Sequence, residues 1–133
     1  EALRKDIKIE SLVDKRIEVL SDFISLDIII SNYLNNAIAY SPNNSKITIS
    51  AEEAYEKIKL SVKDEGEGIP ENYKDRVFER FFRVDKGRSL NQGGTGLGLS
   101  IVKNLASTLS SPVGVENQEP NGASFWIELD KST

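Results

Sequence analysis

Gly93-Gly94-Thr95-Gly96-Leu97-Gly98-Leu99-Ser100-Ile101-Val102-Lys103 is the stretch that decides the fold of this chain. Four of its first six residues are glycine, and apolar residues then recur at every fourth position: Leu97, Ile101, Leu105 and Leu109. A glycine loop therefore leads directly into a helix N-terminus. Such a junction offers unpaired backbone N–H groups and the positive end of the helix dipole, and glycine lets a phosphate approach the backbone closely. We expect a polyphosphate site, because a capping or packing role explains one glycine more readily than four.

The spacing of this loop excludes two common phosphate-binding motifs. The Walker loop requires Gly-Lys-[Ser/Thr], whereas Leu99 and Ser100 follow Gly98. The dinucleotide fingerprint requires G-x-G-x-x-G after a strand, whereas Gly94–Gly98 reads G-x-G-x-G. The loop therefore belongs to another nucleotide-binding fold.

The composition describes one globular domain without thiol or imidazole chemistry. The 133 residues are 38% apolar and 29% charged, with no cysteine and no histidine. Disulfides, thiolate or imidazole metal sites and a histidine nucleophile are thereby excluded within this chain. No apolar run, Ile28–Ile30 among them, is long enough to span a bilayer, so we expect a cytoplasmic domain of a protein that could be membrane-anchored elsewhere.

The charged residues of the chain give a second indication of what the glycine loop binds. A net charge of −4 argues against nucleic-acid binding. Positive charge is nevertheless concentrated just before the glycine loop, at Arg80, Arg83, Lys86 and Arg88. This run is either a solvated face or a set of phosphate contacts.

A strong helical pattern precedes the loop. Ser21-Asp22 offers a helix start, and apolar residues form an every-fourth stripe with a second row beside it, namely Leu26, Ile30, Leu34 and Ile38 with Ile29, Tyr33 and Ala37. We predict a helix from about residue 22 to 40. Asn32, Asn36 and Tyr40 border its apolar face. They are either a solvated polar flank or a site where an amide oxygen meets Mg²⁺.

A β-hairpin follows this helix. Ile47, Ile49 and Ala51 alternate with polar residues, and after a polar linker over 52–57 the residues Ile58, Leu60 and Val62 do the same. The second strand carries its inward face on to Asp64. A buried carboxylate needs a donor, so Asp64 either caps the following turn or accepts a hydrogen bond from a ligand amino group.

The remaining segments are assigned from shorter patterns. We predict a short helix over 71–82, a mobile loop over 83–92, a strand at Val113 and Val115, a turn at Asn121-Gly122 and a closing strand over 123–129. Near the N-terminus, residues 16–20 suggest a short strand, and residues 9–14 suggest either a strand or a helical turn.

Four blocks in fixed order resemble the ATP-binding catalytic domain of two-component sensor histidine kinases, within the superfamily of gyrase, mismatch-repair and heat-shock-chaperone ATPases. Residues 32–40 are similar to the N box, 64–70 to the first glycine box, 77–85 to the F box, and 93–103 to the second glycine box. The resemblance implies one catalytic domain over residues 1–133, with an ATP lid over 83–95. The implied fold is a two-layer α/β sandwich of the Bergerat or GHKL type, in which a mixed sheet is packed against about three helices.

The resemblance also implies ligand roles. Asn36 would bind Mg²⁺ with support from Asn32, Tyr40 would flank the nucleotide, and Asp64 would accept the adenine amino hydrogen bond. Arg83 would approach the γ-phosphate and, with Asn36, act in catalysis. The glycine boxes would supply the other contacts to ATP, from Gly66, Gly68, Ile69, Gly94, Thr95, Gly96, Leu97, Gly98 and Leu99.

The expected chemistry is transfer of the γ-phosphoryl group from ATP to a histidine. In the ATPase branch a glutamate stands where this chain has Asn32, and an amide cannot act as a general base at neutral pH. Because the chain has no histidine, the acceptor would lie on its own dimerisation domain outside this chain, in a homodimeric protein that passes the phosphoryl group to a response regulator. Ala39 departs from the family, which often has Lys or Arg there. It keeps open a nucleotide-dependent interaction module, or degenerate kinase, beside the ATPase alternative.

Overall fold

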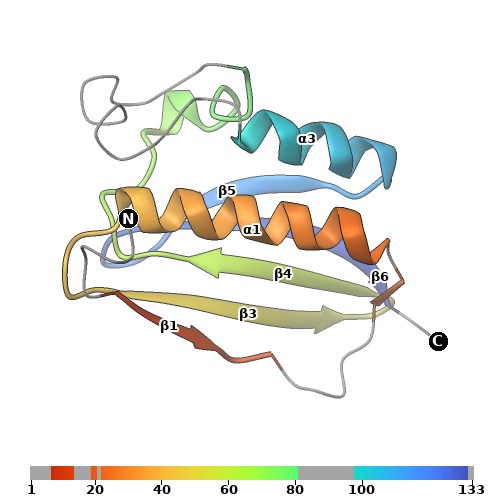
Figure 1. Ribbon diagram of the computed structural model, residues 1–133, viewed down its shortest axis with the longest axis horizontal. Coiled ribbons are helices and arrows are strands. Elements are labelled where there is room, and N and C mark those ends of the chain that lie inside the picture. Colours follow the sequence, from red (N-terminus) through yellow and green to blue (C-terminus); the bar gives the residue numbers. More distant parts are fainter. Residues whose placement is uncertain (1–6, 14–18, 21, 81–97, 132–133) are drawn as a thin grey trace.

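Helices cover one face of a mixed sheet in the computed structural model, which describes residues 7–13, 19–20, 22–80 and 98–131 (Figure 1). The elements in chain order are β1 (Lys8–Ser11), β2 (Val19–Leu20), α1 (Phe23–Tyr40), β3 (Lys46–Ala54), β4 (Lys57–Lys63), the 3-10 turn η2 (Glu71–Tyr73), α3 (Gly98–Thr108), β5 (Val113–Asn117) and β6 (Ala123–Lys131). This arrangement confirms the predicted two-layer α/β sandwich. Within the described residues its helical layer consists of α1, α3 and η2.

The described strands form a six-stranded sheet in the order β1-β3-β4-β6-β2, with β5 also paired to β6. β1 pairs with β3 in parallel and all other pairs are antiparallel. β5 pairs with residues 123–127 at one end of β6, and β2 pairs with Asp130 and Lys131 at the other end. Since β4 takes the opposite edge of β6, β5 and β2 share one edge, and no strand among the described residues pairs with the outer, free edge of β5.

Helix α1 begins and ends as its sequence predicts. The Asp22 side chain accepts a hydrogen bond from the Ser25 N–H at 2.9 Å, and the helix ends at Tyr40 before Ser41-Pro42. Its most deeply buried positions lie on the second of the two predicted apolar rows, at Ile29, Tyr33 and Ala37. The every-fourth stripe is half-buried beside them, at Leu26, Ile30, Leu34 and Ile38.

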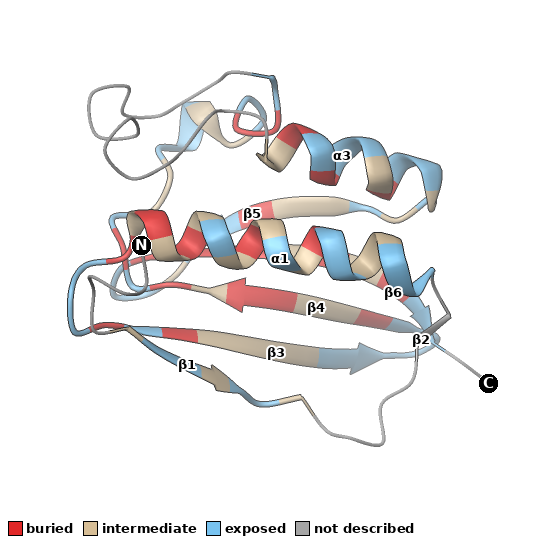
Figure 2. Ribbon diagram, viewed as in Figure 1, coloured by how far each residue is buried: buried red, intermediate tan, exposed pale blue. Residues whose placement is uncertain are grey.

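The core lies between the helices and the sheet. Figure 2 shows buried positions on α1, α3 and the central strands, and mostly exposed positions along β1. The Tyr33 ring lies 5.5 Å from the Phe125 ring, and its hydroxyl donates a hydrogen bond to the Trp126 carbonyl oxygen at 2.8 Å. Burial raises the pKa of the Tyr33 hydroxyl well above its ordinary value, so this side chain is a neutral donor that fixes α1 on β6.

Two local predictions differ from the structure in the limits or type of an element. The hairpin is confirmed, but its strands run on to Ala54 and resume at Lys57, so the predicted linker is mostly strand. The helix over 71–82 is wrong within the described residues, because only Glu71–Tyr73 forms a 3-10 turn and turns follow to residue 80. Tyr73, Val77 and Phe78 contact the core from these turns, so tertiary packing and not local helical spacing determines the backbone of this segment.

The buried face of α3 also differs from the prediction, which placed it on the every-fourth apolar stripe through Ile101. Ile101 is 42% exposed, whereas Val102 and Ala106 are almost completely buried against the core. A helix turns by about 100° per residue, so the face toward the sheet is centred one position beyond the predicted stripe. None of the described helices is long and apolar enough to cross a membrane.

Candidate functional site

One flank of α1 presents the three predicted N-box side chains. Asn32, Asn36 and Tyr40 follow one another at four-residue intervals and are all half-buried, so they form a row about 12 Å long. The Asn32 Nδ2 donates a hydrogen bond to the Ile28 carbonyl oxygen at 2.9 Å, which fixes the amide and leaves Oδ1 as an acceptor. The Asn36 side chain makes no hydrogen bond to another described residue.

The first residue of α3 meets this row at Asn32. A Cβ atom added to Gly98 would lie 3.1 Å from the Asn32 Oδ1, which is closer than ordinary van der Waals contact. Leu99, the next residue, is half-buried and packs against the core. The N-terminus of α3 and the N-box helix are thus in contact, as the predicted phosphate end of a nucleotide site requires.

The opposite end of the row meets the first glycine box. A Cβ atom added to Gly66 would lie only 2.6 Å from the Tyr40 carbonyl oxygen, so no other residue fits there without a backbone shift. This contact brings Asp64, at the end of β4, next to the last turn of α1. The structure therefore joins three of the predicted segments around one flank of α1.

Asp64 is the buried carboxylate of this site. It is 6% exposed, and its Oδ1 accepts hydrogen bonds from the Gly66 N–H at 2.9 Å and the Ala123 N–H at 3.0 Å. Its Oδ2 accepts none from the described residues and is not sealed from solvent. Both interpretations of Asp64 are thus compatible with the structure: Oδ1 caps the turn, and Oδ2 stays available to a ligand.

The protonation of Asp64 reflects its burial. Desolvation raises the pKa of this carboxyl group above 3.8, and the two backbone hydrogen bonds lower it by less than burial raises it. The nearby charge of Glu65 also raises it. The two backbone N–H donors stabilise the ionised carboxylate, but burial still makes ionisation of Asp64 a net free-energy cost in the folded protein.

Two asparagines, neither of which was predicted as a site residue, hold the first glycine box. The Asn117 side chain accepts from the Ile69 N–H at 2.8 Å and donates to the Ile69 carbonyl oxygen at 2.9 Å. The Asn121 Nδ2 donates to the Glu65 carbonyl oxygen at 2.8 Å. The end of β5 and the turn before β6 therefore fix the segment that carries Asp64.

Two glycines of this region have backbone conformations that side chains rarely adopt. Gly122 has φ +108°, and a Cβ there would lie 2.0 Å from the Asp64 carbonyl oxygen. Gly68 has φ +83°, and a Cβ there would lie 2.7 Å from the Asn117 Oδ1. The Asn121-Gly122 turn signal predicted the first position, whereas no sequence signal pairs Asn117 with Ile69.

We expect Asn117→Ala to loosen this region measurably. The change removes both hydrogen bonds to Ile69, so stability should fall by about 1–2 kcal/mol and ATP affinity should fall with it. Thermal denaturation and calorimetric titration with ATP measure the two effects. Asn104→Ala, at an exposed position of α3, is the matched control. Unchanged ATP affinity in the Asn117 variant would contradict a positioning role.

Several predicted site residues fall outside the described residues. These are Arg83, Gly94, Thr95, Gly96 and Leu97, together with the whole lid over 83–95 and the F box beyond residue 80. The described part of the F box includes Val77 and Phe78, which are buried, and the Phe78 ring meets the Phe125 ring edge-on at 6.2 Å. This part of the F box belongs to the core.

The acceptors and donors that the described residues offer are suited to binding a nucleotide together with a metal ion. Asp64 offers an acceptor for an amino group, and the N-terminus of α3 lies beside Asn32 at the other end of the row. The residues that the structure describes contain no cluster of three acidic, histidine or cysteine side chains that could hold a metal alone. A metal at this row would therefore be held by an amide oxygen together with phosphate oxygens and water, as Mg²⁺ commonly is.

Comparison with known proteins agrees with this geometry. Residues 21–133 match the family described as histidine kinase-, DNA gyrase B- and HSP90-like ATPase. The chain is 44% identical over 111 residues to the sensor-like histidine kinase SenX3 of Mycolicibacterium smegmatis, covering 84% of this chain and 29% of that protein.

Two solved structures share the fold. Full-length ShkA in complex with AMPPNP has a TM-score of 0.82 and 30% identity, covering 99% of this chain and 27% of ShkA. The histidine kinase ThkA in complex with the response regulator TrrA has a TM-score of 0.78 and 28% identity, covering 98% of this chain and 36% of that chain. The chain thus spans less than a third of SenX3 and of ShkA. It belongs to the histidine kinase-, DNA gyrase B- and HSP90-like ATPase family.

Proposed function

We propose that this domain binds ATP with Mg²⁺ and donates the γ-phosphoryl group to a histidine of a dimerisation domain outside the chain. The observation that carries the proposal is the row on α1, which has Gly98 at one end and Asp64 with Gly66 at the other. Adenine would lie at Asp64, and the phosphates would lie between Asn32 and the N-terminus of α3. ShkA, which has the same fold, is solved with an ATP analogue.

The metal and catalytic roles extend this arrangement. Asn36 would hold Mg²⁺ through its amide oxygen, because its side chain has no other hydrogen bond among the described residues. When bound, Mg²⁺ neutralises charge on the phosphates. Arg83 would add a positive donor at the γ-phosphate, a role that rests on its place in the F box.

Asn32 favours phosphoryl transfer over hydrolysis. Its Nδ2 is engaged with the Ile28 carbonyl oxygen, and its Oδ1 lies beside Gly98, so the side chain is a fixed amide at the phosphate end. An amide cannot take a proton from water at neutral pH. Attack by a histidine nitrogen on the γ-phosphorus, with release of ADP, needs no such base on this chain.

The partners follow from the composition and the relatives. No histidine occurs in the chain, so the acceptor would be supplied by the remainder of a longer kinase, in a homodimer. ThkA is solved with a response regulator, and we propose that the phosphoryl group passes to such a protein here too. The domain would act in the cytoplasm.

One residue favours a second candidate function. Ala39 is 7% exposed and carries no charge at a place where histidine kinases often have Lys or Arg. Without a cation at this position, the domain would bind the phosphates of ATP less tightly. A domain that binds nucleotide and changes partner contacts without phosphoryl transfer is therefore the alternative.

Labelled ATP distinguishes these functions. The isolated domain is incubated with [γ-³²P]ATP, alone and with the histidine-containing dimerisation domain of its full-length protein. We expect acid-labile phosphohistidine only when that domain is added, and slow release of phosphate otherwise. Rapid ATP turnover by the isolated domain would support an ATPase, and ATP binding without transfer would support the interaction module.

A further inference from the structure

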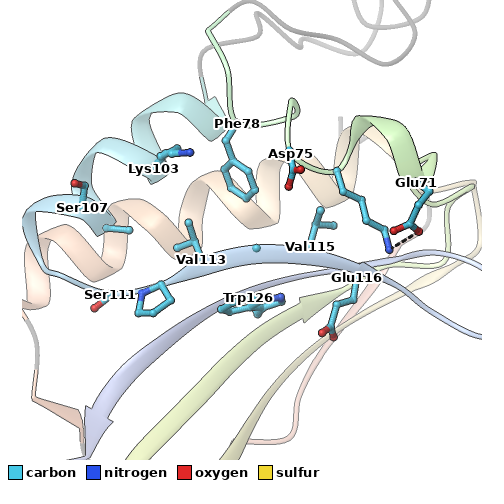
Figure 3. Close-up of a pocket in the computed structure, with 14 residues that line it drawn as sticks. Glu71, Asp75, Phe78, Lys103, Ser107, Ser111, Val113, Val115, Glu116 and Trp126 are labelled. Atoms are coloured by element: carbon cyan, nitrogen blue, oxygen red, sulfur yellow. Dashed lines mark ion pairs between the residues drawn. The ribbon is translucent and has the colours of Figure 1, made fainter.

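A groove of about 580 Å³ lies along the free edge of β5, and none of the residues predicted to bind the nucleotide lines it. Its floor is Val113–Glu116, one wall is the middle of α3, and the other wall is the segment from Glu71 to Phe78. Figure 3 shows Trp126 and Glu116 on one side of β5 and Phe78 with both valines on the other. The groove thus wraps around the edge of the sheet.

The hydrogen-bond pattern of β5 identifies which backbone groups face this groove. The Glu128 N–H donates to the Pro112 carbonyl oxygen at 2.9 Å, and the Gln118 N–H donates to the Gly122 carbonyl oxygen at 2.8 Å, at the two ends of the ladder. Hydrogen-bonded and non-hydrogen-bonded pairs alternate along an antiparallel ladder. Gly114 and Glu116 lie two and four residues after Pro112, so they too direct their backbone N–H and C=O groups toward β6.

Val113 and Val115 therefore direct their N–H and C=O groups toward the free edge. Neither residue has a backbone hydrogen bond outside the ladder within the described part of the chain. Two donors and two acceptors thus line the groove at the spacing of a β-strand. An edge of this kind is a template for another extended chain.

The side chains around this edge suit an extended peptide. Phe78 and Ala106 line the groove above the valines, and both side chains are largely buried in the core. Below the edge, Gly114 lets the Trp126 indole lie against β5, since a Cβ there would meet the ring at 2.5 Å. The Trp126 Nε1 is buried and has no hydrogen-bond partner.

The charges in the groove are partly unpaired. Lys74 pairs with Glu71 at 3.0 Å, and Lys59 pairs with Glu116 at 3.5 Å. Lys103, on the α3 wall, and Asp75, on the opposite wall, have no ion pair with another described residue. An acidic side chain on the same side of the sheet as α3 would be attracted to Lys103.

We propose that a short extended segment of a partner protein binds in this groove by adding a strand to the free edge of β5. Two of its residues pair with Val113 and Val115 and turn their side chains toward α3, one acidic beside Lys103 and one apolar against Phe78. At the other end of β5 the Asn117 side chain engages Ile69, which limits the added strand to a few residues. The inference goes beyond the proposed kinase function and does not depend on it.

The probe is acetyl-Thr-Asp-Thr-Val-Thr-amide, with the same peptide carrying Lys in place of Asp as its counterpart. Binding is followed by amide NMR shifts and hydrogen exchange in the presence of ATP. We expect the Val113 and Val115 amides to shift and to exchange more slowly with the acidic peptide, while Gly114 changes less. Binding of both peptides with equal affinity, or shifts confined to other residues, would overturn the proposal.

Three variants make the test specific. Val113→Pro removes one free-edge donor at the first residue of the strand without removing a ladder bond, so affinity should fall about fivefold, whereas Val113→Thr keeps the donor and the affinity. Lys103→Glu, at an exposed position, should reverse the preference between the two peptides. Unaltered affinity in Val113→Pro and unaltered preference in Lys103→Glu would each contradict strand addition at this edge.

Discussion

Asp64→Asn is expected to lower the affinity for ATP by roughly 10- to 100-fold while the domain stays folded. The asparagine oxygen can keep the two backbone hydrogen bonds that Oδ1 accepts from Gly66 and Ala123. Its amide nitrogen then replaces Oδ2 and meets the adenine amino group as a second donor. The variant therefore loses an acceptor at the ligand and places two donors against each other.

Although Asp64→Asn should lower ATP affinity, it should leave the stability of the domain unchanged or raise it. Burial raises the pKa of Asp64 in the folded state above 3.8, so its contribution to stability is present below the unfolded pKa and is lost as pH rises through the folded pKa. At pH 7 the ionised carboxylate is thus a net cost to folding. The neutral asparagine avoids this cost, so the variant should be at least as stable as the wild type at pH 7.

Calorimetric titration with ATP and thermal denaturation across pH test both effects. The stability difference between variant and wild type should shrink as pH falls from the raised pKa of folded Asp64 toward 3.8, because the folded carboxyl group is protonated before the unfolded one. Asp27→Asn makes the same charge change at an exposed position of α1 and should leave ATP affinity unchanged. If Asp64→Asn lost stability and affinity together, Asp64 would be a structural cap and not an adenine ligand.

Periodic patterns predicted those parts of the fold in which one face of an element is buried. The limits of α1 and the alternation along β3, β4 and β6 follow from side chains that must point toward one core. Asp64 was found by the same rule, because it continues the inward face of β4 as a carboxylate. The N-box row was found because a helix places every fourth residue on one flank.

Contacts between distant segments could not be found in this way. The pairing of Asn117 with Ile69 joins residues 48 positions apart, and nothing in either local sequence specifies the other. The segment after Pro70 was assigned a helix because its apolar residues have helical spacing, yet Val77 and Phe78 reach the core from turns. In both cases tertiary contacts, which local patterns do not encode, determine the backbone.

Asn36→Ala is expected to remove the effect of Mg²⁺ on ATP binding and to slow phosphoryl transfer roughly 10²- to 10³-fold. Asn36 stands one helical turn from both Asn32 and Tyr40, and its amide makes no hydrogen bond to another described residue. Its removal therefore leaves the proposed adenine contact at Asp64 and the hydrogen bond from Asn32 to Ile28 in place. ATP affinity measured in EDTA should consequently stay close to that of the wild type.

Asn35→Ala provides the matched control, because the same change is made at an exposed position about 100° around the helix. ATP affinity of both variants is measured with Mg²⁺ and with EDTA, and transfer is measured on the dimerisation domain. The Asn35 variant should keep the full gain from Mg²⁺, whereas the Asn36 variant should show none. If the Asn36 variant kept that gain, the metal would be held elsewhere. If it lost affinity in EDTA as well, Asn36 would contact the nucleotide directly, because a residue that acts only through the metal has no effect when the metal is absent.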